Sequence, residues 1–195
     1  GGFVAAPSAN ASGKPSPTMA EYVAEDMNGR IEMILDGGAV GIGLESTIVD
    51  FTEEVPVVLR PGYISLEMLR ETLGDVRMDK GLIKPDSKVH PKAPGMKYRH
   101  YAPKADLAIV EGPDERVIAE IEKRALEAEK NGDTEGIIAT DETKDRYSHG
   151  IIKSIGSREQ EETIAHHLYE VLRDFDSCNV SAIYSEAFFT PKMGQ

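Results

Sequence analysis

The sequence contains one cysteine, few aromatic residues and no apolar run of the length that crosses a lipid bilayer. Because Cys178 stands alone, it can form no intrachain disulfide and no cysteine-based metal site, and we expect a buried thiol there. No signal-peptide pattern opens the chain. Together these absences predict a cytoplasmic protein that does not associate with a membrane.

Basic residues are also scarce relative to acidic ones. Lysine and arginine total 22 against 34 aspartate and glutamate residues, which gives a formal net charge of −12. A surface that grips nucleic acid needs clustered lysine or arginine, so this composition argues against direct RNA binding. Much of the acid lies at residues 115–130 and 158–176, where we expect solvated faces of helices.

Residues 1–74 combine helical and strand-like patterns. Leu66, Leu69 and Leu73 at helical spacing predict a short helix that ends at Gly74. The other elements expected here are a helix at 19–27, an apolar segment at 31–35, and strands at 46–51 and 55–59. Residues 75–104 show neither period and hold four of the eleven prolines, which predicts a linker.

From residue 105 onward, strand-like runs alternate with helices. Strands are predicted at 107–110, 136–139, 151–152 and 180–184, and helices at 113–130 and 159–175. This alternation predicts an α/β fold with a parallel, Rossmann-like sheet. The side chains of the last helix that should face inward are Ile164, Leu168, Val171, Leu172 and Phe175.

Familiar catalytic and metal-binding patterns are missing. No G-x-G-x-x-G sequence follows the first strand of the second half, so dinucleotide binding there is unsupported. No Ser-His-Asp arrangement is present either. His166 and His167 are adjacent on a predicted helix and point about 100° apart, so they do not easily chelate one ion. We therefore predict no metal site in this chain.

Residues 6–18, which we name the Ser-Ala-Asn loop, have the most unusual composition. Five hydroxyl or amide side chains lie among three prolines and a glycine. Proline restricts the backbone, glycine permits a tight turn, and the polar side chains supply neutral donors and acceptors. Two interpretations are open: a rigid cradle for a phosphate or an amino acid, or a surface loop whose Thr18 caps the following helix.

The loop's string Pro-Ser-Ala-Asn-x-Ser-Gly-x-x-Ser-Pro-Thr resembles the signature of the YrdC-type threonylcarbamoyl-AMP synthases. Three more segments resemble that family in the same order. They are Leu-Glu-Ser-Thr-Ile-Val-Asp at 44–50, Leu-Arg-Pro-Gly at 59–62, and Pro-Gly-Met-Lys-Tyr-Arg-His-Tyr-Ala-Pro at 94–103. One such match is weak, but four in order over the first 104 residues are specific.

The resemblance implies three parts: residues 1–74 as the later part of a YrdC-like α/β catalytic domain, 75–104 as an interdomain linker, and 105–195 as a Rossmann-like carboxyl-terminal domain. Family members carry a long first half of the catalytic domain, with lysine and arginine side chains that hold the nucleotide. They usually end in a helix rich in Asn, Arg and Leu. We therefore expect an internal fragment of a longer, two-domain enzyme, inactive by itself.

The activity that the resemblance implies is that of a nucleotidyltransferase. It condenses L-threonine, bicarbonate and ATP, with Mg²⁺ accompanying the ATP, to threonylcarbamoyl-AMP and pyrophosphate. The product serves threonylcarbamoyladenosine modification of tRNA, so tRNA is reached indirectly, and other tRNA-modification proteins are the expected partners. Because this chemistry depends on positioning and on neutralising phosphate charge, we assign no catalytic residue.

Carried over by position, the resemblance assigns Ser8 and Ser46 to threonine, and Asn10, Thr18 and Arg60 to ATP. Thr18 precedes a predicted helix, where free N–H groups favour a phosphate, although plain capping is compatible with that role. Arginine binds phosphate oxygens in a bidentate fork. The alternatives are an ordinary strand serine at Ser46 and a surface ion pair at Arg60.

The linker carries a further candidate group at residues 97–101. Its two tyrosines, histidine and two cations are unusual in a chain that is 6% aromatic. Such a segment can fold over a nucleotide and exclude water from a labile anhydride, or it can be a passive tether between domains. We assign Tyr101 to ATP, with Arg99 and His100 as further partners.

A competing hypothesis from another class is a non-catalytic module that binds RNA or a regulatory ligand. The acidic balance counts against the RNA version of this hypothesis.

Overall fold

The computed structural model describes residues 2–3, 5–83 and 103–188. The chain divides into two compact units. The larger unit joins Gly1–Gly43 to Tyr101–Phe189, and the smaller unit comprises Leu44–His100 with Thr190–Gln195. The Ser-Ala-Asn loop therefore belongs to the same compact unit as the second half of the chain.

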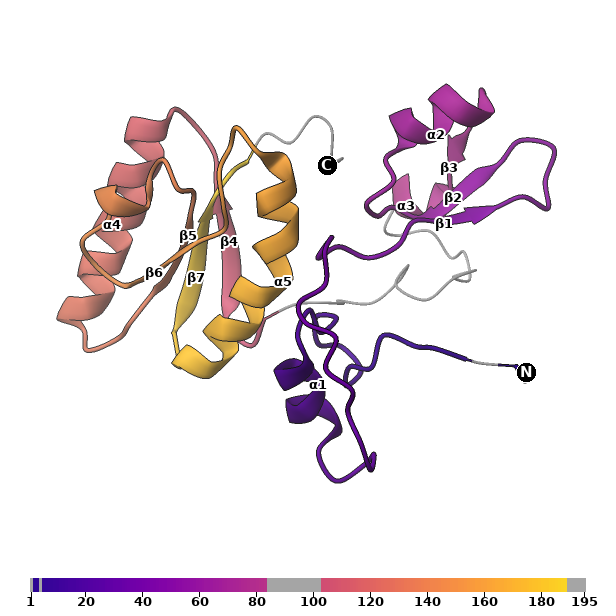
Figure 1. Ribbon diagram of the computed structural model, residues 1–195. Coiled ribbons are helices and arrows are strands. Elements are labelled where there is room, and N and C mark those ends of the chain that lie inside the picture. Colours follow the sequence, from indigo (N-terminus) through magenta and orange to yellow (C-terminus); the bar gives the residue numbers. More distant parts are fainter. Residues whose placement is uncertain (1, 4, 84–102, 189–195) are drawn as a thin grey trace. The chain divides into compact units, whose positions relative to one another are not determined.

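A four-stranded sheet forms the centre of the larger unit (Figure 1). Its strands are β4 (Asp106–Val110), β5 (Gly136–Ala139), β6 (Ile151–Ser154) and β7 (Ala182–Glu186). They lie in the order β4-β7-β5-β6, and every pairing is parallel. The parallel sheet and the α/β fold class predicted from the sequence are confirmed.

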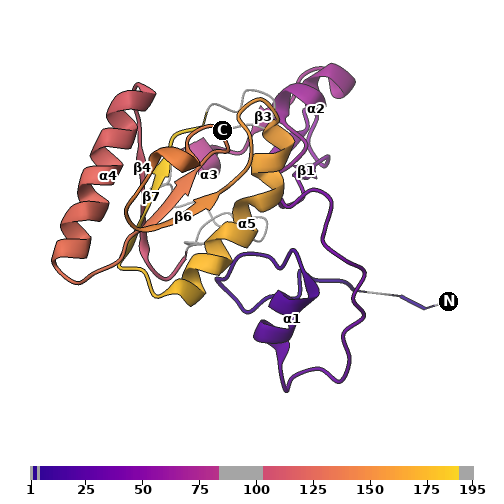
Figure 2. The same ribbon diagram turned by 60° about the vertical axis from the view of Figure 1, so that its left-hand side comes forward.

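Helices α4 (Asp114–Lys130) and α5 (Glu161–Cys178) cover opposite faces of this sheet, as Figures 1 and 2 show. The central strand β5 is buried throughout, and its successive side chains join different cores. Ile137 packs in the cluster that contains Ile121 of α4, whereas Ile138 packs in the cluster that contains Phe175 of α5. Burial on both faces explains why this strand is continuously apolar in sequence.

The apolar face predicted for α5 is also observed. Ile164, Val171, Leu172 and Phe175 are buried, and Leu168 is partly buried against the same cluster. Two short elements complete the larger unit: helix α1 (Ala20–Met27) and the 3-10 helix η1 (Lys144–Arg146). The apolar segment at residues 31–35 forms neither helix nor strand, and it is exposed.

The smaller unit contains a three-stranded sheet and two short helices. The strands are β1 (Ile48–Asp50), β2 (Val57–Arg60) and β3 (Arg77–Met78), and the helices are α2 (Leu66–Leu73) and α3 (Lys80–Ile83). β2 pairs antiparallel with β1 and parallel with β3. The Ser65 hydroxyl caps α2 by accepting from the Met68 N–H, and the helix ends at Gly74, whose φ of 81° suits glycine.

Among the described residues, no helix combines the length and the apolar character that a bilayer span requires.

Candidate functional site

The Ser-Ala-Asn loop is folded back on itself by its own polar side chains. Asn10 Nδ2 donates to the carbonyl oxygens of Ala11 at 3.0 Å and Lys14 at 3.1 Å. Ser8 Oγ donates to Asn10 Oδ1 at 2.5 Å. Gly13, at φ 90°, supplies a left-handed turn between Ala11 and Lys14. The structure thus brings the predicted residues Ser8 and Asn10 into direct contact, with the Ser8 side chain exposed.

The carboxylate of Asp26, on α1, binds both the backbone and a side chain of this loop. Its Oδ2 accepts from the Ala11 N–H at 3.0 Å, and its Oδ1 accepts from Lys14 Nζ at 2.6 Å. Arg173 Nη2 donates to the same carboxylate at 2.9 Å. Burial opposes the charged form, but the hydrogen bonds from Arg173, Lys14 and Ala11 outweigh it. They hold the pKa of the Asp26 carboxyl well below its ordinary value.

Arg173 lies in α5, the helix that packs against the parallel sheet, and its side chain binds the loop. Its Nε donates to the Pro15 carbonyl at 3.1 Å, and its Nη2 donates to the same oxygen. The guanidinium carbon lies 5.2 Å from the centre of the Tyr22 ring, within the range of a cation–π contact. Tyr22 in turn donates its hydroxyl to Asp174 at 3.2 Å. Two neighbouring residues of α5 therefore bind the loop and α1.

Thr18 is buried, but it does not cap α1. The N-cap position is Met19, and no side chain makes a capping hydrogen bond. The capping interpretation is wrong because Thr18 lies one residue too early for its hydroxyl to replace the cap. Within the described residues, Thr18 Oγ1 has no hydrogen-bond partner, while its carbonyl accepts from the Val40 N–H at 2.9 Å.

Thr18 also lines an open cavity of about 320 Å³ in the larger unit. Much of the remaining lining comes from the apolar segment that follows α1. Met33 and Leu35 of that segment are 74% and 87% exposed. Exposure of this kind is unusual for neighbouring apolar side chains of such size.

In the smaller unit, Arg60 and Ser46 lie against each other. Arg60 Nε and Nη2 donate to the Ser46 carbonyl at 3.1 and 2.9 Å, and Nη2 donates to Ser46 Oγ at 3.0 Å. Glu45 forms an ion pair with the same nitrogen at 3.5 Å. The antiparallel pairing of β1 with β2 produces this contact, since Ile48 is the register partner of Arg60.

The Arg-Pro-Gly turn requires its glycine. A Cβ on Gly62 would lie 2.3 Å from the Glu45 carbonyl oxygen, well inside van der Waals contact. The backbone after Arg60 therefore passes directly over the segment that carries Glu45 and Ser46. This close approach fixes the backbone from which the Arg60 side chain extends.

The predicted residues fall into two groups, one in each unit. Ser8, Asn10 and Thr18 belong to the larger unit, and Ser46 and Arg60 belong to the smaller unit. Tyr101, with Arg99 and His100, lies outside the described residues. The contacts also identify two residues that the sequence did not single out, Asp26 and Arg173.

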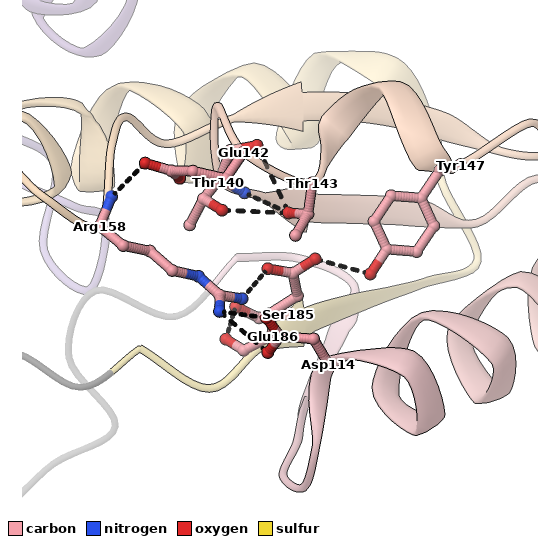
Figure 3. Close-up of polar contacts among 8 residues, drawn as sticks. All are labelled: Asp114, Thr140, Glu142, Thr143, Tyr147, Arg158, Ser185 and Glu186. Carbon is pink, nitrogen blue, oxygen red and sulfur yellow. Dashed lines mark hydrogen bonds and ion pairs between the residues drawn. The ribbon is translucent and has the colours of Figure 1, made fainter.

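A second set of polar side chains, the carboxyl-edge cluster, lies where the strands of the larger sheet end (Figure 3). Glu186, the last residue of β7, is 1% exposed and accepts from the Tyr147 hydroxyl at 2.7 Å and from Arg158 Nη2 at 2.6 Å. Arg158 Nη1 donates to both oxygens of Asp114 at 2.9 and 3.0 Å. Burial, followed by the hydrogen bond to Glu186 and the charge of that carboxylate, raises the pKa of the Tyr147 phenol well above its ordinary value.

The rest of the cluster connects the loops that follow β5 and β6. Glu142 Oε1 accepts from Ser157 Oγ at 2.6 Å and from the Arg158 N–H at 3.0 Å. The Thr140 and Thr143 hydroxyls lie 3.0 Å apart. Ligands of open α/β sheets bind at this edge. Here the charged groups bind one another, and the cluster ties the start of α4 to the end of β7.

Metal binding gains no support from the described residues, among which no three His, Cys, Asp or Glu side chains are grouped to hold an ion. His166 and His167 are half-buried, with their rings 4.9 Å apart and nearly perpendicular. His167 Nδ1 lies 2.8 Å from the Thr163 carbonyl oxygen, one turn earlier in α5. That contact is within the helix itself.

The sequence of this chain matches two protein-family models and several known proteins. A family model described as "Threonylcarbamoyl-AMP synthase, C-terminal domain" matches residues 64–195, and one described as "Telomere recombination" matches residues 1–62. The threonylcarbamoyl-AMP synthase of Bacillus subtilis (strain 168) is 48% identical over 185 residues, which cover 95% of this chain and 52% of that protein. The enzyme of the same name from Pyrococcus abyssi is 43% identical over 183 residues, covering 94% of this chain and 52% of that protein.

The fold of the chain also matches that of a solved structure. The crystal structure of P. abyssi Sua5 complexed with L-threonine matches with a TM-score of 0.81 and 40% identity, over 94% of this chain and 52% of that one. The chain thus spans about half the length of the curated relatives it matches. The resemblance drawn from the four motifs is confirmed, and the chain belongs to the threonylcarbamoyl-AMP synthase family.

Proposed function

We propose that the complete protein carrying this chain synthesises threonylcarbamoyl-AMP from L-threonine, bicarbonate and ATP. The threonine amine adds to bicarbonate and water leaves, which yields a carbamate. A carbamate oxygen then attacks the α-phosphorus of ATP, and the bond to the β-phosphate breaks to release pyrophosphate. The reaction makes the enzyme a nucleotidyltransferase, and its product supplies threonylcarbamoyladenosine modification of tRNA.

The observation that carries the proposal is the contact between Arg60 and Ser46, in a chain whose relatives are named for this activity. The reaction needs the carbamate next to the α-phosphate, so the threonine and ATP sites must adjoin. A hydroxyl assigned to threonine, 3.0 Å from a guanidinium assigned to phosphate, suits that requirement. The solved relative that was crystallised with L-threonine adds independent support for the amino acid.

The remaining assignments concern the larger unit and the linker. We propose that Ser8 contacts threonine and that Asn10, Thr18 and Tyr101 contact ATP. The contact between the Ser8 and Asn10 side chains supports neighbouring ligands, as at Ser46 and Arg60. The Thr18 hydroxyl is buried without a partner among the described residues, and a ligand oxygen would satisfy it.

We propose further that ATP binds with Mg²⁺, held chiefly by substrate phosphates and water, as is usual for this ion. Because the chain carries a net charge of −12, we propose that tRNA is served through the released product and not through a docking surface here. The proposed compartment is the cytoplasm, with other tRNA-modification proteins as partners.

The test is pyrophosphate release by the full-length synthase, with each of the three substrates omitted in turn. We expect release only when threonine, bicarbonate and ATP are all present. Release that is independent of threonine and bicarbonate would contradict the proposal. Binding of RNA or a small ligand with no turnover would favour the non-catalytic module instead.

A further inference from the structure

We propose that Arg173 is a positioning residue, through which the parallel-sheet part of the larger unit holds the Ser-Ala-Asn loop in its ligand-binding form. The inference rests on the proposed function, because it assumes that Ser8 and Asn10 contact substrates. It gives the sheet and α5 a role in substrate binding, although none of the residues proposed to contact a substrate lies in them.

The first step is the burial of the contact. The Arg173 and Asp26 side chains are 3% and 0% exposed, and the two residues lie 147 positions apart in sequence. A buried guanidinium needs a partner for its charge and for its N–H groups. Asp26 and the Pro15 carbonyl supply both. The loop backbone at Pro15 is thus bound directly by a side chain of α5.

The second step leads from Asp26 to the substrate side chains. Its carboxylate binds the Ala11 N–H, which directly follows Asn10, and the Lys14 ammonium. Asn10 donates to the carbonyl oxygens of these same two residues, and Ser8 donates to Asn10. Arg173, Asp26, the loop backbone and the substrate side chains therefore form one continuous hydrogen-bonded path.

The third step is the rigidity of α5, which contacts the first 43 residues at three places along its length. A Cβ on Gly43 would lie 2.4 Å from the His166 carbonyl oxygen, so the chain passes very close to the helix there. Asp174 accepts from the Tyr22 hydroxyl and from Lys153 Nζ, the latter at 2.6 Å. On its other side, α5 packs into the core of the sheet through residues such as Phe175. It is therefore a fixed support for the loop.

The experiment compares Arg173→Met with a matched control, Arg158→Met. Arg158 is likewise a guanidinium paired with carboxylate in the larger unit, but its partners Asp114 and Glu186 belong to the carboxyl-edge cluster and not to the loop or α1 (Figure 3). Both changes remove a paired guanidinium and should lower thermal stability. In the full-length synthase, we expect only Arg173→Met to raise the threonine KM, by tenfold or more, with Arg158→Met within twofold of wild type.

A second measurement follows the loop without relying on turnover. Amide exchange at Ala11, whose N–H is bound by Asp26, should accelerate at least tenfold in Arg173→Met and remain at the wild-type rate in Arg158→Met. Arg173→Lys, which keeps the charge beside Asp26, should give intermediate values, and it replaces the methionine variant if that one fails to fold.

The outcomes separate the two hypotheses. Unchanged Ala11 exchange in the Arg173 variants, or equal changes in threonine KM for Arg173→Met and Arg158→Met, would overturn the positioning role. If the wild-type enzyme shows no synthesis while Ala11 exchange responds as expected, the proposed function fails and the hold on the loop stands.

Discussion

Replacing Asp26 with asparagine should destabilise the larger unit more than a typical single substitution does. The change leaves Arg173 buried at 3% exposure without a counter-charge and removes the carboxylate partner of Lys14 and of the Ala11 N–H. Breaking a buried ion pair by removing one partner costs about 3–5 kcal/mol. With an m value of about 2 kcal/mol/M, the urea midpoint should fall by about 1.5–2.5 M.

The double variant Asp26→Asn/Arg173→Met is the internal control for this magnitude. Because it removes both charges, it should recover part of the loss, and the coupling energy should lie between about 0.5 and 3 kcal/mol. Urea unfolding followed by circular dichroism measures all four proteins. If the two single losses simply add, the charges are not coupled and the reasoning from burial is wrong.

The same carboxylate predicts an acid dependence. The folded pKa of Asp26 lies below its unfolded value of about 3.9, so its stabilisation is complete above that value and is lost as pH falls through the folded pKa. The difference in free energy of unfolding between wild type and Asp26→Asn should therefore be constant from about pH 7 to 5 and shrink below about pH 4. A difference that stays constant down to pH 3 would contradict the low pKa.

Further predictions concern the other contacts. In the full-length synthase, Arg60→Ala should lower kcat/KM for ATP by about 10- to 150-fold with an unchanged circular dichroism spectrum, since a hydrogen bond to a charged group contributes about 1.5–3 kcal/mol; wild-type kinetics would remove Arg60 from the site. Gly62→Ala should lower both Tm and kcat/KM, because its Cβ would overlap the Glu45 carbonyl; a variant as stable and active as wild type would show that the turn is not constrained. Tyr147→Phe should destabilise the larger unit by about 1.5–3 kcal/mol in urea unfolding, because Glu186 loses a buried donor; a loss under 0.5 kcal/mol would refute that contact. The 195-residue chain alone should form no threonylcarbamoyl-AMP in a radiolabel assay, and detectable product would show that it holds a complete site.

Much of the fold was predictable because most helices and strands show their apolar spacing within a short stretch of sequence. The alternation of strand-like and helical patterns after residue 105 predicted the parallel sheet, and the apolar spacing in α5 predicted its buried face. The elements that were missed are β3, α3 and η1, which have two to four residues and are too short to show a period. β3 depends on pairing with β2, a contact that no local pattern contains.

The candidate site was predictable only in part, for the same reason. Composition and resemblance singled out Ser8, Asn10, Ser46 and Arg60 as candidates; the structure pairs them as two contacts, and their roles stay predictions. Arg173 could not be found, because its partner Asp26 lies 147 residues away and a charged residue on a helix is ordinarily assigned to the solvent face. The capping role offered for Thr18 failed by one residue, which is the usual precision of a helix boundary.

The most direct test of the proposed function follows the carbon of bicarbonate. The full-length synthase is incubated with ¹⁴C-bicarbonate, L-threonine and ATP, and the nucleotides are separated by chromatography. The proposal predicts a labelled adenylate that forms only with threonine present and in equal amount to the pyrophosphate released. Pyrophosphate or ADP formation with no label in the adenylate would contradict it.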